Sequence, residues 1–391
     1  MKKKVIIVGG GAAGLIAAVR LARSVGGVAV AERNSRVGKK LAATGNGQGN
    51  VTNSEMTCAH FRSSRAEFPR AALSRFGYAE AEAFYRSVGI FLTKGAGKKY
   101  PLSLQASSVS DALRFAAEAA GAALITDCAV ARVRKTEGGF AAYAADGREL
   151  RAEKLVLAFG GRAGAQFGTD GSAYALAEGF GHTLTPTYPS LVQLKTETEK
   201  IRGLKGIRMA ARVRAKGRYE AESAGDVIFT DYGVSGSAVF AVSGAVAAGG
   251  ELEIEFLPDI SESELYGILR ERADFGGGML DGIVHKQLGR MLEKQVGTDV
   301  KKTVSALKRF RLKAEGALGF DTAQVTAGGV NTAEVDENTM ESRLAKGLYF
   351  AGEALDVDGD CGGYNLHWAF ASASAAAEAI AAEAIAAEAS L

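Results

Sequence analysis

The chain has 391 residues, of which 47% are hydrophobic and 23% charged, so its composition is that of a folded globular protein and excludes a disordered one. Its length exceeds the ~250–300 residues at which a single hydrophobic core stops growing, which predicts more than one domain. The formal net charge is only +3 and the basic residues form no long block, so we expect no nucleic-acid partner.

The three cysteines, Cys58, Cys128 and Cys361, are far apart in the sequence and have no CxxC spacing. They therefore predict neither a disulfide framework nor a zinc site, which fits a reducing compartment. The apolar run Val5–Val8 after the N-terminal lysines is too short for a signal-peptide core or a membrane span. We expect a cytoplasmic protein with no targeting segment and no membrane partner.

The chain is predicted to open as a strand, a tight turn and a helix. Residues 5–8 form a continuous apolar run that ends in glycines, residues 12–22 have helical spacing, and residues 28–31 read as the next buried strand. Together they have the size of one parallel βαβ unit. A further apolar run at 155–158 again ends in glycines, Gly160 and Gly161.

The pattern changes between about residues 185 and 321. The stretches 211–215 and 251–256 alternate between apolar and charged residues, which predicts half-exposed antiparallel strands. From Ser261 the pattern becomes helical, with Glu264 at capping-box spacing and apolar residues between 283 and 292 at a helical period.

These changes predict an interrupted domain. We assign residues 1–187 and 322–391 to one dinucleotide-binding domain, residues 188–258 to an inserted β-rich subdomain, and residues 259–321 to an inserted helical subdomain. The alanine-rich tail after residue 371 is predicted to be helical by propensity.

The first glycine cluster has GxGxxG spacing between the predicted strand and helix. Gly9 permits a sharp turn, Gly11 lets the backbone approach a pyrophosphate, and Gly14 lets the helix lie close to the strand. Glu32 ends the second strand, where a carboxylate can accept hydrogen bonds from ribose hydroxyls. These residues predict a dinucleotide but do not separate NAD from FAD.

Two later segments favour FAD. Residues 38–53 combine lysines, closely spaced glycines and small amides, which suits a backbone wrapped around a long anionic cofactor, although a flexible surface loop is the alternative. Near the C-terminus, a strand runs into Gly352 and Glu353, and Gly362–Leu366 begins a final helix. The N-terminus of that helix would stabilise the negative charge that reduction places on a flavin.

Aspartates at 356, 358 and 360 have a spacing like that of a calcium-binding loop. No glutamate follows at the twelfth position, so we expect no metal.

The motifs together resemble the BaiN/YhiN-like family of NAD(P)/FAD-dependent oxidoreductases, the aminoacetone oxidase family of FAD-binding enzymes. The resemblance covers nearly the whole chain in order, including the insertion. It rests on the segments 9–15, 44–53, 100–103, 168–171, 181–182, 229–236, 324–330, 339–342, 349–353 and 362–366.

The resemblance implies an α/β fold: a discontinuous Rossmann-like two-dinucleotide-binding FAD domain with an inserted β-barrel-like subdomain and a helical subdomain. It also implies non-covalent FAD and leaves NAD(P)H open as a transient electron donor. Carried over by position, the pyrophosphate would be held by Gly9, Gly11, Ala13 and Gly14, the ribose by Glu32 and the adenine by Val130. The middle of the cofactor and its flavin side would be lined by Lys40, Thr44, Gly45, Asn46, Asn50 and Thr52. The far side would be closed by Gly352, Glu353, Asp356, Gly363, Asn365 and Leu366, and Gly161 is also predicted to bind the cofactor.

The chain departs from the family pattern at three places. Residues 47–50 read Gly-Gln-Gly-Asn where the family commonly has Gly-Arg-Cys-Asn, so a mechanism that needs that cation or thiol does not apply. Asp231 stands where His is common and His367 where Gln is common, and these two changes would retune a substrate pocket.

No catalytic residue is assigned from the sequence. We expect His182 to be a packed structural histidine and His285 to be exposed on a helix, whereas His367 lies near the predicted flavin site. Cys361 is expected to be a small buried apolar residue rather than a redox centre. Flavin chemistry needs little from side chains beyond orientation and a proton relay.

We therefore predict an FAD-dependent oxidoreductase that acts on a small organic substrate by hydride transfer to or from flavin N5. Two variants stay open: an oxidase of small amines such as aminoacetone, and an NAD(P)H-fed reductase of unsaturated compounds such as bile-acid intermediates. The middle of the chain has no second GxGxxG after a strand, which weakens the reductase.

Two further readings compete with this prediction. A non-catalytic or RNA-associated flavoprotein is supported only by Arg202, Lys205 and Arg208. An ordinary NAD-dependent dehydrogenase would leave the C-terminal glycine segments without a role. The oligomeric state does not follow from the sequence.

Overall fold

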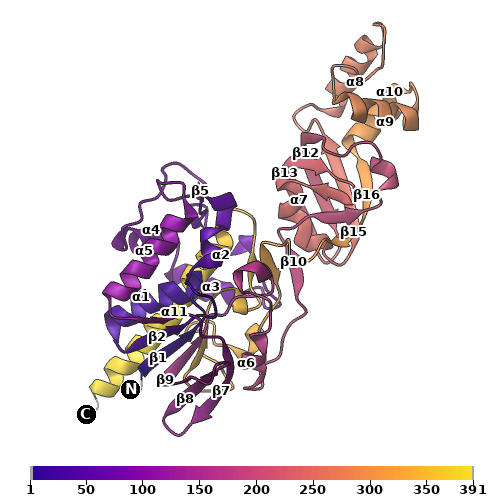
Figure 1. The fold of residues 1–391 in the computed structure, drawn as a ribbon. Helices are drawn as coiled ribbons and strands as arrows, with labels where there is room; N and C mark the ends of the chain where they lie inside the picture. Colours follow the sequence, from indigo (N-terminus) through magenta and orange to yellow (C-terminus); the bar gives the residue numbers. More distant parts are fainter. Residues whose placement is uncertain (1–2, 390–391) are drawn as a thin grey trace. The chain divides into compact units, whose positions relative to one another are not determined.

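The structure, a computed structural model, describes residues 3–389. By its internal contacts the chain forms two compact units, Met1–Thr187 with Val325–Leu391, and Tyr188–Gln324 (Figure 1). The second unit thus spans residues 188–324, and the domain division made from the sequence, with boundaries at 188 and 322, stays a prediction.

The first unit is built on a seven-stranded sheet. Its central pairs, β1 with β2, β1 with β9, β2 with β6 and β9 with β18, are parallel, whereas β7, β8 and β9 pair antiparallel. The strands predicted at 5–8, 28–31 and 155–158 all lie in the parallel part, which explains their continuous apolar runs. The strands are β1 (Lys3–Val8), β2 (Val28–Ala31), β6 (Ala123–Ile125), β7 (Val130–Thr136), β8 (Gly139–Ala144), β9 (Glu149–Leu157) and β18 (Leu348–Phe350).

Helices cover this sheet, and α1 lies beside α11, the C-terminal helix (Figure 1). Two small antiparallel pairs, β3 with β5 and β4 with β19, connect residues 52–62 to neighbouring loops. The helices are α1 (Ala12–Ser24), α2 (Lys39–Ala42), α3 (Phe68–Arg75), α4 (Tyr78–Ser87), α5 (Ala106–Ala119), α6 (Tyr174–Glu178) and α11 (Tyr364–Glu388), and the short strands are β3 (Thr52–Asn53), β4 (Phe61–Arg62), β5 (Lys98–Lys99), β17 (Val325–Ala327) and β19 (Asp358–Gly359).

Helix α11 begins at Tyr364, within the segment 362–366 that was predicted to begin the final helix, and it includes the alanine-rich tail. Among the described residues it is the one helix long and apolar enough to cross a membrane by length and composition alone, and core helices of folded proteins pass the same test. Ala371, Ala373, Ala375 and Ala376 are fully buried, and the helix packs against α1. We interpret α11 as a core helix of this unit, in which small side chains allow close packing.

The second unit contains a closed antiparallel barrel with the strand order β11-β14-β13-β12-β15-β16. Alternation along 211–215 and 251–256 is confirmed, since Val213 and Ile254 are buried and each lies between charged neighbours that are partly or fully exposed. The elements are β10 (Tyr188–Ser190), β11 (Leu194–Thr196), β12 (Arg208–Lys216), β13 (Glu220–Phe229), β14 (Gly233–Ser235), α7 (Ser237–Val242), β15 (Gly250–Phe256), α8 (Glu262–Arg272), α9 (Lys286–Val296), α10 (Val300–Lys308) and β16 (Phe310–Ala317).

The segment predicted to be helical, 259–321, also supplies the barrel strand β16. Phe310, Leu312 and Ala314 are buried and alternate with exposed residues, a period-two pattern that the sequence analysis overlooked. Leucines of α8–α10 and side chains inside the barrel form one hydrophobic cluster. The division into β-rich and helical subdomains therefore stays a proposal, with β16 assigned to the barrel.

Helix α8 begins as predicted, because the Ser261 hydroxyl accepts a hydrogen bond from the Glu264 backbone N–H. Helix α9 begins at Lys286, so the apolar residues at 283 and 284 lie in the preceding turn.

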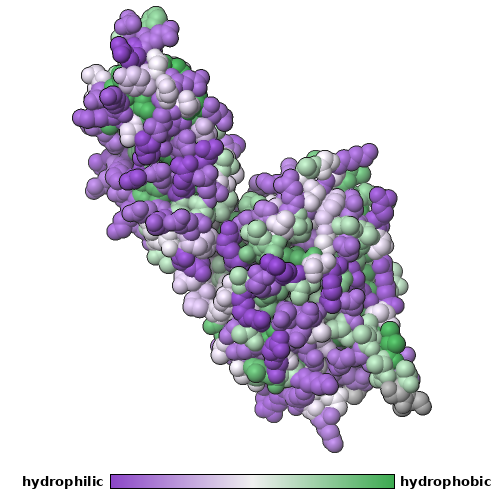
Figure 2. Space-filling model, turned by 180° about the vertical axis from the view of Figure 1, so that it is seen from behind, coloured by the Kyte–Doolittle hydropathy of each residue, from purple (hydrophilic) through white to green (hydrophobic). Residues whose placement is uncertain are grey.

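Charged side chains on the barrel strands pair with one another across the sheet. Arg214 contacts Glu222 at 2.6 Å and Arg311 contacts Glu253 at 3.0 Å. Hydrophilic residues accordingly dominate the visible face of this unit in Figure 2.

Candidate cofactor site

The turn before α1 is shaped by glycines with different constraints. A Cβ on Gly9 would lie 2.4 Å from the Ala158 carbonyl oxygen, and one on Gly14 would lie 1.8 Å from the Gly9 oxygen, so packing within the protein requires both glycines. A Cβ on Gly11 would meet nothing within 4 Å. Among the described residues, the N–H groups of Ala12 and Ala13 at this helix N-terminus have no hydrogen-bond acceptor. Open space beside unpaired N–H donors at a helix N-terminus is the environment that a pyrophosphate needs.

Glu32 lies against this turn with only 7% of its surface exposed. One carboxylate oxygen accepts the Gly10 N–H at 2.8 Å, and the other accepts the Asn34 backbone N–H at 2.8 Å and its side-chain amide at 2.6 Å. Glu32 therefore fixes the glycine turn, a role that the sequence did not reveal. A carboxylate accepts up to about four hydrogen bonds, so the predicted ribose contact stays compatible with this arrangement. Val130 packs in a small cluster with Ala31, next to Glu32 in the sequence.

Lys40 and Glu353, which are 313 positions apart, meet in the structure. The Lys40 ammonium lies 2.6 Å from one Glu353 carboxylate oxygen, and each side chain is 21% exposed. The other Glu353 oxygen accepts the Thr326 N–H at 2.8 Å. A Cβ on Gly161 would lie 2.4 Å from the Thr326 hydroxyl oxygen, so Gly161 is needed for this close packing.

This pair permits a double-mutant test. We expect Lys40→Met and Glu353→Gln each to destabilise the protein and the double variant to lose less than the sum, with a coupling free energy of about 1 kcal/mol for this partly exposed pair. Urea unfolding of the four proteins measures the coupling. Lys4 and Glu388 form an exposed pair at 3.8 Å, which serves as a matched control with an expected coupling near zero.

Residues 50–53 hold the N-terminus of α11. In the amide orientation that satisfies its neighbours, Asn50 accepts the Gly363 N–H at 3.0 Å and donates to the carbonyls of Thr52 at 3.1 Å and Lys99 at 3.2 Å. Asn53 donates to the Gly362 carbonyl at 2.9 Å. The two glycine-rich regions predicted to enclose the flavin are thus joined directly.

The start of α11 also has unpaired donors. No described residue accepts a hydrogen bond from the N–H groups of Asn365 and Leu366. Gly352 connects this region to the first helix, because a Cβ there would lie 2.8 Å from the Ala13 Cβ. Both helix N-termini therefore carry free N–H groups within the same unit, which suits a phosphate-linked cofactor whose ring gains negative charge on reduction.

Several predicted cofactor residues use their side chains within the protein. The Thr52 hydroxyl lies 2.8 Å from His367 Nδ1, Asp356 accepts the Ser64 N–H at 2.9 Å, and Asn365 accepts the Gly359 N–H at 2.8 Å. The Thr44 hydroxyl donates to the Leu41 carbonyl at 2.7 Å. Each of these side chains therefore already has at least one partner within the protein.

Gly45 and Asn46 have positive φ angles of 59° and 54° in a short helical turn, and Asn46 is exposed. Gly45 lies against Asn50, because a Cβ on it would be 2.9 Å from the Asn50 nitrogen, whereas the Asn46 side chain makes no hydrogen bond to another described residue.

Three of the four histidines use their ring nitrogens in hydrogen bonds within the protein. His182 lies between Glu334, at 3.1 Å, and Ser342, at 2.8 Å, and burial lowers its pKa despite the carboxylate. His367 is fully buried, donates from Nε2 to the Phe76 carbonyl at 2.9 Å, and burial lowers its pKa to about 4. His285 is exposed, but it caps the N-terminus of α9 instead of lying within a helix.

The fourth histidine, His60, belongs to a cluster that the sequence did not predict. Its Nδ1 lies 3.0 Å from one Asp360 oxygen, and the Arg62 guanidinium lies 2.5 Å from the other. The imidazole stacks on the Tyr364 ring at 4.2 Å with an interplanar angle of 20°. These contacts link residues about 300 positions apart, so no local sequence pattern could predict them. In the sequence, Asp360 was considered only as part of the calcium-like aspartate spacing.

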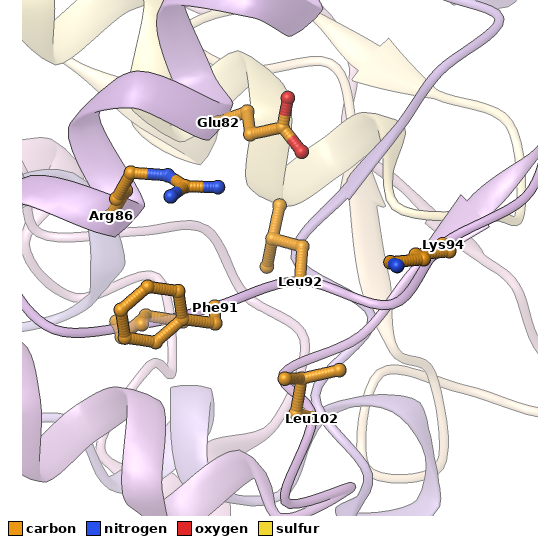
Figure 3. Close-up of a pocket in the computed structure, with 7 residues that line it drawn as sticks. Glu82, Arg86, Phe91, Leu92, Lys94 and Leu102 are labelled. Atoms are coloured by element: carbon orange, nitrogen blue, oxygen red, sulfur yellow. The ribbon is translucent and has the colours of Figure 1, made fainter.

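A separate pocket lies between α4 and residues 90–102 (Figure 3). Its volume is about 180 Å³, and it contains none of the predicted cofactor residues. The pocket is lined by Glu82, Arg86, Ile90, Phe91, Leu92, Lys94 and Leu102.

The unit combines a largely parallel central sheet, a glycine turn that leads into α1, an acidic residue directly after β2 and a second helix N-terminus. These features define a Rossmann-type FAD domain of a flavin-dependent oxidoreductase. The sequence profile of the HI0933-like protein Rossmann domain matches residues 3–379, and the chain belongs to this family.

Curated relatives agree with this assignment. A 3-dehydro-bile acid delta(4,6)-reductase of Clostridium scindens is 39% identical, over 94% of this chain and 96% of the relative. A ribosomal RNA dihydrouridine synthase of Escherichia coli is 31% identical, over 95% and 96% respectively. Among solved structures, the Mycobacterium smegmatis Sdh1 complex in the apo form has a similar fold, with a TM-score of 0.50 and 14% identity over 99% of this chain and 69% of that chain.

Proposed function

We propose that this flavoenzyme reduces a carbon–carbon double bond conjugated to a carbonyl group in a small organic substrate, with NAD(P)H as the electron donor. The observation that carries the proposal is the 39% identity to the Clostridium scindens reductase over nearly the full length of both chains. The name of that relative describes a 3-keto compound with double bonds at positions 4 and 6, which is such a conjugated system.

The chemistry divides between cofactor and protein. Bound FAD supplies hydride transfer at N5. The N–H groups at the start of α1 would hold the phosphates, and those at the start of α11 would stabilise negative charge on the ring. Lys40 and Glu353 would position the middle of the cofactor. FAD and the residues assigned to it are part of this proposal.

The amine oxidase is the weaker enzyme alternative because no described observation favours it. The middle of the sequence has no second GxGxxG motif for a nicotinamide domain. This is compatible with the reductase if NAD(P)H binds transiently, delivers its hydride and leaves before the substrate enters.

The proposal is tested on the purified protein by anaerobic stopped-flow absorption. We expect a flavin spectrum, rapid bleaching by NADH or NADPH, and reoxidation by a 3-keto-4-ene steroid acid with loss of its conjugated absorption. Reduction by a small amine but not by a nicotinamide, followed by peroxide formation with oxygen, would establish the oxidase instead.

Ribosomal RNA reduction is a second candidate, because relatives from Haemophilus influenzae and Escherichia coli named ribosomal RNA dihydrouridine synthases are 30% and 31% identical. The 5,6 double bond of uracil is also conjugated to a carbonyl. On α9, Lys286, Arg290 and Lys294 recur every fourth residue and are exposed, and among the described residues none has an ion-pair partner. They form one cationic stripe.

Arg202, Lys205 and Arg208, which the sequence analysis considered for RNA binding, are less suited to it because two of them are paired with carboxylates. Lys205 lies 2.7 Å from Asp231 and Arg208 lies 2.5 Å from Asp226. Replacing the three α9 cations by Gln should therefore weaken RNA binding and reduce its salt dependence by about three phosphate contacts. The triple Gln variant of Arg202, Lys205 and Arg208 should change RNA affinity and its salt dependence little. Equal loss in both triples, or no binding at physiological salt, would remove this candidate.

A further inference from the structure

The segments around His60 and Asp360 are fixed against each other by the backbone. Strand β4 pairs antiparallel with β19, with Phe61 opposite Gly359, and the Asp360 N–H donates to the His60 carbonyl at 2.9 Å. The side chains of His60 and Asp360 therefore meet on a rigid pair of strands rather than on a loose loop.

The pairing also determines which imidazole nitrogen is free. An ionised carboxylate can only accept hydrogen bonds, so His60 Nδ1–H donates to Asp360 over 3.0 Å. Nε2 has no hydrogen-bond partner among residues 3–389, and the His60 side chain is 33% exposed. Asp360 thus fixes the tautomer and the stack on Tyr364 fixes the ring plane, while Nε2 can exchange protons with solvent.

The His60 ring contacts a residue at the predicted flavin end of the site. Tyr364, on which His60 stacks, is the first residue of α11. The two residues that follow it, Asn365 and Leu366, carry the unpaired N–H groups that are predicted to face the flavin ring. His60 therefore stacks on the residue that directly precedes the N–H groups predicted to face the flavin ring.

Neighbouring groups that could donate a proton are less suitable. The Tyr364 hydroxyl already donates to the Glu55 carbonyl at 3.4 Å. His367 uses both ring nitrogens in hydrogen bonds. Among the described residues no carboxylate is hydrogen-bonded to Cys361, and burial raises the pKa of its thiol.

We propose that His60, oriented by Asp360, is the general acid that protonates the α-carbon of the conjugated substrate. The inference rests on the proposed reductase function. In the balanced step, a hydride from the reduced flavin forms the C–H bond at the β-carbon, the double bond breaks, and the Nε2 proton of the imidazolium forms the C–H bond at the α-carbon. NAD(P)H restores the reduced flavin and water restores the proton on His60.

The test compares His60→Gln, Asp360→Asn and the control His285→Gln, which changes a histidine in the other unit. General acid catalysis contributes about 10²–10⁴-fold, so flavin reoxidation by the 3-keto-4-ene substrate should slow by ~10²-fold or more in His60→Gln. FAD content, flavin reduction by NAD(P)H and substrate affinity for the oxidised enzyme should stay within about threefold. His285→Gln should match the wild type.

Two readouts do not depend on turnover rate alone. In D₂O the wild type should place deuterium on one face of the α-carbon, and His60→Gln should lose this facial selectivity. Nitrogen-15 NMR of the substrate-free protein should assign neutral His60 to the Nδ1–H tautomer, and Asp360→Asn should mix the tautomers.

The outcomes separate the two hypotheses. A wild type that is reduced by NAD(P)H but never reoxidised by a conjugated ketone refutes the proposed function, and the acid role falls with it. A wild type that reduces the ketone while His60→Gln does so at an unchanged rate and with unchanged facial selectivity overturns the acid role alone.

Discussion

Replacing Gly11 by alanine should raise the dissociation constant of FAD by ~10–100-fold while leaving the FAD-free protein as stable as the wild type. The backbone at Gly11 has an ordinary φ of −77°, and a Cβ there meets no protein atom within 4 Å. Overpacking costs typically ~1–3 kcal/mol, and here it would arise only when the pyrophosphate enters the same space. Flavin fluorescence titration and urea unfolding measure the two quantities separately.

Gly14 gives the opposite pattern within the same motif. Its Cβ would lie 1.8 Å from a backbone oxygen, so Gly14→Ala should destabilise the FAD-free protein itself by ~3 kcal/mol or more. Gly267→Ala, in α8 where a Cβ has open space, is the control; it should leave FAD affinity unchanged and stabilise slightly. Full FAD affinity in Gly11→Ala would show that the pyrophosphate does not approach this turn.

Acidification should destabilise the protein through His367, with a loss of about 2 kcal/mol between pH 7 and pH 5. Burial lowers its pKa to about 4 from the ordinary value of 6.5, so between these values the unfolded chain binds the proton more strongly than the folded one. The stabilisation is complete above pH 6.5 and is lost as the pH falls toward 4. His182, whose pKa is also lowered by burial, acts in the same direction.

The variant His367→Gln should reduce this pH dependence while a residual slope from His182 remains. Glutamine can donate to the Phe76 carbonyl and accept from the Thr52 hydroxyl, as the imidazole does. Urea unfolding at pH 5, 6 and 7 compares the two proteins. An unchanged slope in the variant would mean that His367 is already accessible to protons in the folded state.

Local sequence patterns were sufficient to predict the first secondary-structure elements of the chain. The apolar runs at 5–8 and 28–31 and the helical spacing from Ala12 correspond to β1, β2 and α1, because strand and helix periodicity are properties of neighbouring residues. The capping serine of α8 was found for the same reason. The ordered motifs across the whole chain identified the flavoenzyme family.

Tertiary structure decided which distant residues meet. Lys40 pairs with Glu353 and His60 pairs with Asp360, and no spacing along the chain encodes either contact. Likewise β16 joins the barrel although helices precede it, and its alternating apolar face is buried in the barrel cluster where it pairs with β11 and β15. Sequence periodicity determines what each segment can form, whereas the partner that buries a face or neutralises a charge is selected when the segments pack together.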